Sequence, residues 1–328
     1  MKRVMVTGCA GFIGSKTVAA LLEDPGVEVV GIDCITDYYS PELKRNRLAE
    51  IDNSRFEWHE VDIRSESLKE HTAELDGVIH LAGQPGVRPS WGKSFDNYVA
   101  HNVSATQALL ELISTSSPLA KVVYASSSSV YGDAMRYPTV ESDVPRPVSP
   151  YGVTKLAGEH LVSLYAKKRG LSAVSLRYFT VYGPGQRPDM AFTRLAAAAV
   201  ARKPFGLFGD GSQVRDFTYV DDVVAANLLA LTNQQRPGAV YNIAGGSQVS
   251  MRTCIDLVSA LTGSPVALAM SDPMAGDVKR TSGGTEAATT ELGWLPRISI
   301  EEGLAAQVEW VRDNLQTVIS SIERYDAK

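Results

Sequence analysis

A tyrosine and a lysine four residues apart, Tyr151 and Lys155, open a segment with helical spacing. On a helix this spacing places both side chains on one face. A nearby ammonium group lowers the pKa of a phenol, so Tyr151 could take the proton of a hydroxyl group while a hydride leaves the same carbon. The same pair is also common on protein surfaces, and only its surroundings can decide between the two interpretations.

Four consecutive serines, Ser126 to Ser129, follow the apolar run Val122 to Ala125 and precede Val130-Tyr131-Gly132. If the run is a strand of a parallel sheet, these hydroxyl groups lie at its carboxyl end, where ligands of such sheets bind. Their presence favours the chemical interpretation of the Tyr151/Lys155 pair.

A glycine loop with the spacing G-x-x-G-x-x-G, formed by Gly8, Gly11 and Gly14 around Phe12 and Ile13, joins the first apolar run to a helical pattern over Ser15 to Glu23. Glycines let a pyrophosphate approach the backbone at the positive end of the helix. Asp33 ends the second run, 19 residues after Gly14, where a carboxylate accepts hydrogen bonds from the adenosine ribose. The order predicts a bound NAD rather than NADP, because the carboxylate repels a 2′-phosphate. A purely structural turn is the alternative.

Two further strand ends fall at the same predicted edge: Asp62-Ile63 after the third strand, and Leu81-Ala82-Gly83 after the fourth. Each alone reads as an ordinary strand end, but together they support a dinucleotide site.

Apolar runs alternate with helical patterns up to about residue 180, which predicts an α/β fold with a Rossmann-type, doubly wound parallel sheet. The runs are Val4 to Val6, Val27 to Ile32, Val78 to Leu81, Val122 to Ala125 and Val174 to Leu176. We expect residues 1–179 to form the dinucleotide domain, with 216–246 rejoining it. Residues 180–215 and 247–328 are richer in loop residues and are expected to form a smaller substrate-binding α/β domain.

Several end signals frame the segment that carries Tyr151. Ser149 and Pro150 precede it, and Lys167, Lys168, Arg169 and Gly170 close it. A serine cap, a proline in the first turn, a basic last turn and a terminal glycine predict one helix.

Composition excludes other classes of protein. The net charge of −5 with no basic cluster argues against nucleic-acid binding. The three cysteines, Cys9, Cys34 and Cys254, have no metal-ligand spacing, and we expect buried or half-buried thiols and no metal site. Neither a signal segment nor a membrane span is indicated, so the expected location is the cytoplasm, without membrane contact.

The glycine spacing, Asp33, the serine run and the Tyr151/Lys155 pair together resemble the extended short-chain dehydrogenase/reductase family, and within it the nucleotide-sugar 4-epimerases, over nearly the whole chain. The resemblance implies that Ser127, Tyr151 and Lys155 are catalytic and that Ser128 is a secondary substrate contact. It implies an isomerase in which Tyr151 takes the C4 proton, NAD takes the C4 hydride, the 4-keto sugar rotates and the hydride returns. Ser128-Ser129 stands where the related dehydratases carry Asp-Glu, which argues against dehydration.

Thr180 and Arg187 suggest which sugar is bound. The pattern is similar to the UDP-glucuronate 4-epimerases, in which these residue types hold the sugar carboxylate. The resemblance therefore implies interconversion of UDP-glucuronate and UDP-galacturonate. The alternative is that Arg187 is solvated or paired with Asp189, in an epimerase for neutral UDP-sugars.

The resemblance also implies other substrate contacts. Arg215 would bind the diphosphate, Gln84 and Arg88 would cover the sugar, residues 205–209 would hold uracil, and Asp277 and Arg280 would lie at the nucleotide end.

The alternatives are UDP-glucose 4-epimerase, UDP-glucuronate decarboxylase and a non-catalytic dinucleotide-sensing protein. A homodimer is expected through helices near Asn97 to Leu112 and Tyr151 to Lys168.

Overall fold

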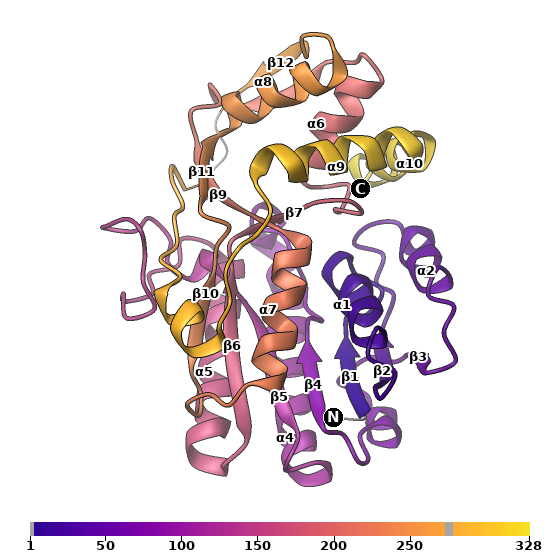
Figure 1. The fold of residues 1–328 in the computed structure, drawn as a ribbon, viewed down its shortest axis with the longest axis vertical. Coiled ribbons are helices and arrows are strands. Elements are labelled where there is room, and N and C mark those ends of the chain that lie inside the picture. Colours follow the sequence, from indigo (N-terminus) through magenta and orange to yellow (C-terminus); the bar gives the residue numbers. More distant parts are fainter. Residues whose placement is uncertain (1–2, 273–277) are drawn as a thin grey trace.

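The computed structural model describes residues 3–272 and 278–328. Its centre is a sheet of seven strands in the order β10-β6-β5-β4-β1-β2-β3, and all neighbouring strands are parallel (Figure 1). This order contains the 3-2-1-4-5-6 arrangement of a Rossmann-type sheet and confirms the predicted fold class. The strands are β1 (Arg3–Thr7), β2 (Glu28–Asp33), β3 (Phe56–Glu60), β4 (Gly77–His80), β5 (Lys121–Ser127), β6 (Ser172–Tyr178) and β10 (Val240–Ile243).

Helices connect these strands and form most of the C-terminal region. The α-helices are α1 (Phe12–Leu22), α2 (Pro41–Ala49), α3 (Phe95–Tyr98), α4 (Ala105–Ser116), α5 (Pro150–Arg169), α6 (Ala191–Val200), α7 (Val220–Thr232), α8 (Met251–Thr262), α9 (Ile300–Asp313) and α10 (Leu315–Asp326). Short 3-10 segments are η1 (Glu66–His71), η2 (Arg88–Ser90), η3 (Gly92–Ser94) and η5 (Ser128–Val130), and π-helical segments are η4 (Val99–Ser104) and η6 (Ala288–Leu292).

Both faces of the sheet are covered, which explains why its central strands are apolar without alternation. Val4 and Val6 of β1 belong to a buried cluster with side chains of α1 and α7. Met5, between them, points to the other face and joins a cluster with α4 and α5. Alternate residues of one strand therefore fill two separate cores.

Helix α5 has the ends that the sequence predicts. The Ser149 side chain accepts a hydrogen bond from the Gly152 N–H, and Pro150 occupies the first turn. Gly170 ends the helix in the left-handed conformation, with φ 75°. Tyr151 and Lys155 thus lie in the first two turns, next to the strand ends at the carboxyl edge of the sheet.

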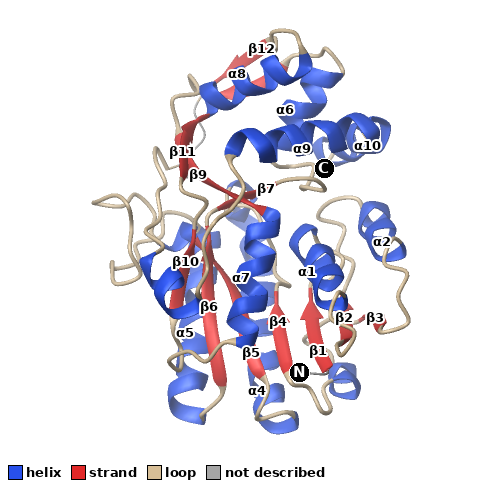
Figure 2. Cartoon of the chain, in the orientation of Figure 1, coloured by secondary structure: helices blue, strands red, loops and turns tan. Residues whose placement is uncertain are grey.

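A second region stands over that edge (Figure 2). Helices α6, α8, α9 and α10 share one buried cluster that includes Phe192, Leu195, Ile255 and Leu304. Its strands are β7 (Thr180–Tyr182), β8 (Phe205–Phe208), β9 (Val214–Tyr219), β11 (Ser247–Ser250) and β12 (Leu268–Ser271), in sheets β11-β9-β7 and β12-β8. Between these elements, α7 and β10 return to the large sheet.

Helix boundaries differ from the sequence expectation at two places. Helix α1 begins at Phe12, inside the glycine loop, rather than at Ser15. The helix expected near Asn97–Leu112 contains the π-helical segment η4, in which the buried Asn102 turns its side chain out of the helix toward the end of β4. Such segments often lie at functional sites.

The three cysteines are free thiols: Cys9 and Cys254 are buried, and Cys34 is half-buried, as predicted. None of the helices in residues 3–272 and 278–328 has the length and apolar character to cross a bilayer.

Candidate active site

Two cavities meet at the carboxyl edge of the large sheet. We call the first the sheet-edge cavity. Its walls are the glycine loop, the ends of β2, β4 and β5, and the first turns of α5. It contains every residue predicted to hold a dinucleotide: Gly8, Gly11, Phe12, Ile13, Gly14, Asp33, Asp62, Ile63, Leu81, Ala82, Gly83, Tyr151 and Lys155.

The glycine loop fits a ligand that approaches the backbone. Gly8 has φ 73°, and a Cβ there would lie 2.8 Å from the Ala82 nitrogen. A Cβ on Gly14 would lie 2.0 Å from the Gly8 carbonyl oxygen. Only glycine keeps this turn closed against the N-terminus of α1, so the residues present fit a pyrophosphate.

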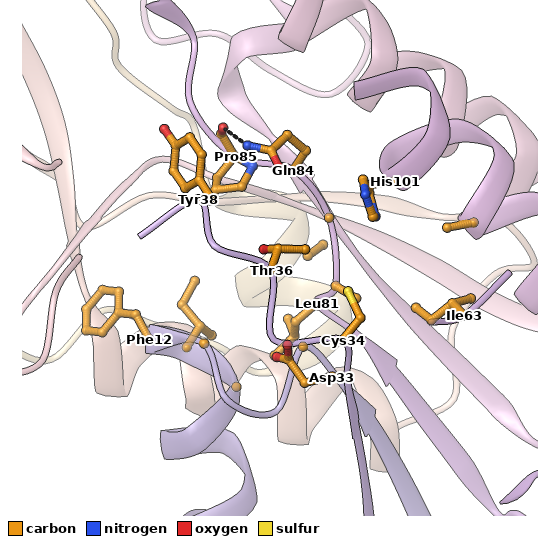
Figure 3. A pocket seen from close by; sticks show the side chains of 18 of the residues that line it. Phe12, Asp33, Cys34, Thr36, Tyr38, Ile63, Leu81, Gln84, Pro85 and His101 are labelled. Carbon is orange, nitrogen blue, oxygen red and sulfur yellow. Dashed lines mark hydrogen bonds between the residues drawn. The ribbon is translucent and has the colours of Figure 1, made fainter. Parts of the chain in front are cut away.

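Asp33 lies at the base of the sheet-edge cavity, next to Cys34 (Figure 3). Its Oδ2 accepts from the Ala10 N–H at 3.1 Å and its Oδ1 from the Ile35 N–H at 2.8 Å. These bonds fix the carboxylate while each oxygen keeps a lone pair for a ribose hydroxyl.

Lys44 also lines this part of the cavity and is not among the predicted residues. Its Nζ donates to the Thr36 carbonyl at 2.7 Å and to the Thr36 hydroxyl at 3.0 Å. Burial lowers the pKa of Lys44. The residue comes from α2, 11 positions after Asp33, and no sequence motif marks it.

Ile63 lies at the end of the cavity away from Phe12, on the same side as His101 (Figure 3), and the adjacent Asp62 also lines the cavity. Arg64 donates to both oxygens of Asp62, from Nε at 3.0 Å and from Nη2 at 2.6 Å. This pairing holds the pKa of Asp62 below its usual value. The Asp62 carboxylate is therefore fixed at the rim.

Asn102 fixes the loop after β4 and was not predicted either. Its Oδ1 accepts from the Gln84 N–H at 2.7 Å, and its Nδ2 donates to the Gln84 carbonyl and to the Thr154 hydroxyl of α5. A Cβ on Gly83 would lie 2.8 Å from the same Oδ1. The π-helical segment thus ties the loop to the helix that carries Tyr151.

Tyr151 lines the sheet-edge cavity and is half-buried. Tyr98 packs edge-on against its ring with centroids 6.3 Å apart, while the Tyr98 hydroxyl donates to the carbonyls of Pro85 and Gly86. Burial raises the pKa of Tyr151, whereas a hydrogen bond with Ser127 and the charge of Arg187 lower it.

Lys155 is buried one turn after Tyr151. Its Nζ donates to the Ala125 carbonyl at 2.9 Å, and burial lowers its pKa to about 8. From the spacing of the two residues we expect this ammonium group to lower the pKa of Tyr151. In the structure Arg187 contributes in that direction, burial raises the pKa of Tyr151 overall, and Lys155 Nζ is turned toward the end of β5.

A buried polar cluster anchors the serine run. Glu159, two turns beyond Tyr151, accepts from the Ser126 hydroxyl at 2.8 Å and from Arg177 Nε and Nη2 at 3.0 and 2.5 Å. Arg177 also donates to the Tyr131 hydroxyl at 2.7 Å. The cluster joins α5 to β5 and β6, and so sets the position of Ser127 relative to Tyr151.

The outer cavity, of about 800 Å³, lies between the large sheet and the C-terminal region. This volume is within the range of small-molecule sites. Arg88, Thr180, Arg187 and Arg215 line it, as do residues 205–208 of β8. Arg194, which pairs with Asp326, and Lys203 also line it. The five basic side chains outnumber the lining acids Asp189, Glu323 and Asp326, which suits a negatively charged ligand.

Arg187 lines both cavities. It is paired with Asp189, which is the alternative that the sequence left open for this residue. The pair is mostly buried at the junction of the cavities rather than solvated at a loop tip. Arg47 stabilises the turn just before Arg187: it donates to the Gly185 carbonyl at 2.6 Å and to the Ala10 carbonyl of the glycine loop at 3.4 Å.

The remaining predicted substrate residues are scattered. Gln84 lines the sheet-edge cavity, and Ser127 and Ser128 lie where β5 meets η5. Arg280 is exposed, donates to Gln248 and lies over the Tyr137 ring, outside the lining of both cavities. Asp277 lies outside the described residues.

Two carboxylates that follow Arg215 in the sequence, Asp216 and Asp222, accept hydrogen bonds from backbone N–H groups. Asp216 accepts from the backbone N–H groups of Gly246 and Gly283, and burial raises its pKa to about 6. Asp222 accepts from the backbone of Arg297 and Ile298. Both carboxylates join β9 and α7 to later segments of the chain.

Residues 4–244 match the NAD dependent epimerase/dehydratase family. A UDP-glucuronate 4-epimerase of Thermodesulfobacterium geofontis is 38% identical over 96% of this chain and 98% of its own. An uncharacterised UDP-glucose epimerase of Bacillus subtilis is 38% identical over 94% of this chain and 98% of its own. The crystal structure of UDP-glucuronic acid 4-epimerase from Bacillus cereus, in complex with UDP-glucuronic acid and NAD, is 40% identical and superposes with a TM-score of 0.91 over 95% of this chain and 99% of that one.

Proposed function

The chain belongs to the NAD dependent epimerase/dehydratase family, and from this premise we propose that it is a UDP-glucuronate 4-epimerase, interconverting UDP-glucuronate and UDP-galacturonate with bound NAD. One observation carries the choice of a uronate. An arginine, Arg187, lies at the point where the sheet-edge and outer cavities meet, close enough for its charge to act on the Tyr151 phenol.

The sheet-edge cavity is the site for NAD. The glycine loop would hold its pyrophosphate, Asp33 and Lys44 its adenosine ribose, and residues 62–63 its adenine. NAD supplies the hydride acceptor and donor when bound. Lys155, whose ammonium group is fixed by Ala125, can donate a second hydrogen bond toward the cofactor.

Tyr151 is the base that removes the proton from the sugar hydroxyl. Ser127 hydrogen-bonds the same phenol and orients it. The Glu159–Arg177 cluster holds the serine segment in place, and Tyr98 fixes the ring. Because the site is buried, the proton transfers directly between phenol and substrate rather than through bulk water.

Thr180 and Arg187 hold the sugar carboxylate. Oxidation at C4 turns a uronic acid into a β-keto acid, which loses carbon dioxide when its carboxylate stands perpendicular to the ring carbonyl. A guanidinium group binds carboxylate oxygens in a fixed plane. The clamp therefore keeps the carboxylate out of that alignment and favours epimerisation.

The positive side chains of the outer cavity would bind the UDP moiety. Arg215 and Arg88 are suited to the diphosphate, and the backbone of β8 to the uracil. Contacts from Asp277 and Arg280 at the nucleotide end stay predictions.

Product analysis tests the proposal. Purified protein incubated with UDP-glucuronate should form UDP-galacturonate without net reduction of NAD. UDP-pentose with released carbon dioxide would indicate a decarboxylase, and epimerisation of UDP-glucose at a comparable rate would indicate a neutral-sugar enzyme. Binding of NAD without conversion of any nucleotide sugar would favour the dinucleotide-sensing alternative.

We also infer a homodimer formed through α4 and α5. Val153 and Leu164 of α5 are 48% and 52% exposed, as expected for side chains that a second subunit would cover. A monomer mass in solution would contradict this. The division into residues 1–179 with 216–246, and 180–215 with 247–328, and the cytoplasmic location likewise stay predictions.

A further inference from the structure

The arginine at the junction of the cavities is held along one edge by an acid two residues later. Arg187 Nε donates to Asp189 Oδ1 at 2.9 Å and Nη2 donates to Oδ2 at 2.8 Å. The two side chains are only 20% and 9% exposed. Two parallel bonds fix the plane of a guanidinium group. Nη1 takes no part in the pair and remains available to a second carboxylate.

Asp189 is itself held by segments from both ends of the chain. The Tyr38 hydroxyl, from the loop after β2, donates to Asp189 Oδ2 at 3.4 Å. The Tyr325 hydroxyl of α10 lies 3.3 Å from the Tyr38 hydroxyl, and the two rings pack edge-on with centroids 5.6 Å apart. Figure 3 shows Tyr38 beside Pro85. A Cβ on the next residue, Gly86, would lie 2.4 Å from the Tyr38 hydroxyl oxygen. We call Asp189, Tyr38 and Tyr325 the clamp support.

An acid beside a carboxylate-binding arginine could also compete with the ligand. The contacts of Asp189 argue against this role. Burial acts to raise the pKa of Asp189, but Arg187, a backbone hydrogen bond and Tyr38 outweigh it and keep the pKa below its usual value. Asp189 thus stays charged chiefly through Arg187, and its own backbone and Tyr38 help to hold it in place. A ligand carboxylate can join Nη1 without displacing it.

We propose that Asp189, held by Tyr38 and Tyr325, is a positioning residue that aims the Arg187 guanidinium at the sugar carboxylate and so sets the preference for uronates. The inference rests on the proposed function. It assigns a role in specificity to the C-terminal helix, because Tyr325 lies in the last turn of α10.

The test compares the dissociation constants of UDP-glucuronate and UDP, measured by calorimetry on the NAD-loaded protein. Asp189→Asn should weaken UDP-glucuronate about tenfold, the loss expected when a charged hydrogen-bond partner is removed, and leave UDP unchanged. Tyr38→Phe and Tyr325→Phe should each weaken UDP-glucuronate about twofold to fivefold. The amount of carbon dioxide released per epimerisation should rise most in Asp189→Asn and less in Tyr38→Phe and Tyr325→Phe.

Two controls separate positioning from general structure. Arg236, Glu291 and Tyr241 form a similar arginine–acid–tyrosine cluster away from both cavities, so Glu291→Gln should not change either dissociation constant. In an Arg187→Met background, Asp189→Asn should have no further effect on the UDP-glucuronate to UDP ratio, because a positioning residue acts through the arginine.

Tighter or unchanged binding of UDP-glucuronate in Asp189→Asn would overturn the inference, as would equal weakening of both ligands. If Asp189→Asn does not fold, the two tyrosine variants decide: an unchanged ratio in both overturns it. A wild-type protein that binds UDP-glucuronate no more tightly than UDP refutes the proposed uronate function itself, and the inference with it. Failure in the variants alone leaves the proposed function standing.

Discussion

The sheet-edge cavity and the outer cavity meet at Tyr38 and Arg187, yet they are built in different ways. The first is formed by the glycine loop and by residues at the strand ends of the Rossmann sheet. The second is formed by charged and apolar side chains brought from the loop after β4, from α6, β8 and β9, and from α10. The sheet-edge cavity would hold the same cofactor for every substrate. The side chains of the outer cavity can distinguish one sugar from another.

The comparison implies that changes in the sheet-edge cavity affect all nucleotide sugars equally, whereas changes in the outer cavity discriminate between them. Replacement of Tyr151, the proposed base in the wall of the sheet-edge cavity, should affect turnover without affecting the binding of NAD or of the sugar nucleotide. Each of these statements can be tested separately.

Tyr151→Phe should have the largest effect. Removing the proposed base should lower kcat with UDP-glucuronate by about 10²- to 10⁴-fold, the usual contribution of general acid–base catalysis. NAD content and the dissociation constant of UDP-glucuronate should change little. Turnover near the wild-type rate would remove the phenol from the mechanism.

Arg187→Met should discriminate between ligands. Loss of a charged hydrogen bond of about 1.5–3 kcal/mol corresponds to roughly a tenfold to 150-fold weaker affinity for UDP-glucuronate. Affinity for UDP and for UDP-glucose should stay unchanged, as titration of each ligand would show. Equal weakening of all three would mean that the arginine serves the nucleotide or the fold.

Gly14→Ala should act on every substrate alike. Its Cβ would lie 2.0 Å from the Gly8 carbonyl oxygen, and overpacking of about 1–3 kcal/mol corresponds to roughly a fivefold to 150-fold weaker NAD affinity. NAD retained after purification and desalting is the measurement. Gly26→Ala, in the turn after the same helix, is the matched control, because its Cβ meets only Asp24 Oδ1 at 3.3 Å.

The pH dependence should give the smallest effect. Burial lowers the pKa of Lys155 from 10.5 to about 8, so its ammonium group is present below pH 8 and lost above it. We expect kcat/KM to fall about tenfold per pH unit above that value. Because the pKa of Lys155 is lower in the folded chain than in the unfolded one, its contribution to folding stability rises from pH 8 to 10.5. The fall in kcat/KM is therefore not caused by unfolding linked to the titration of Lys155. The remaining activity of Lys155→Arg should not decline over this range, and a flat wild-type profile to pH 9.5 would contradict the prediction.

Much of the sheet-edge cavity could be predicted from the sequence because its residues sit at fixed offsets from strands and glycines. Gly8, Asp33 and Leu81 each follow an apolar run, and parallel strands bring their carboxyl ends to one edge. The resemblance to the extended short-chain dehydrogenase/reductase family and its epimerases is confirmed by the family match over residues 4–244. Lys44 and Asn102 escaped prediction because their roles depend on how α2 and the π-helical segment dock against the sheet.

In the outer cavity, Arg187 was predicted as a clamp with Asp189 as an alternative partner. Both interpretations describe the same side chain, because a guanidinium group can hold an internal acid along one edge and offer Nη1 to a ligand. The sequence shows that Asp189 is close to Arg187. It does not show that Tyr325, 136 positions after Asp189, reaches this pair through the Tyr38 hydroxyl.

The sequence by itself determined the fold class, the glycine loop and the helical spacing of Tyr151 and Lys155, because hydrophobic period, glycine spacing and helical offset act over short distances along the chain. The catalytic role of Ser127 was implied by the family resemblance and stays a prediction. Only the tertiary structure decided that Lys155 faces Ala125, that Arg187 lowers the pKa of Tyr151, and that the last turn of α10 supports the clamp. These are contacts between segments far apart in the chain, and their geometry follows from packing the C-terminal region over the sheet.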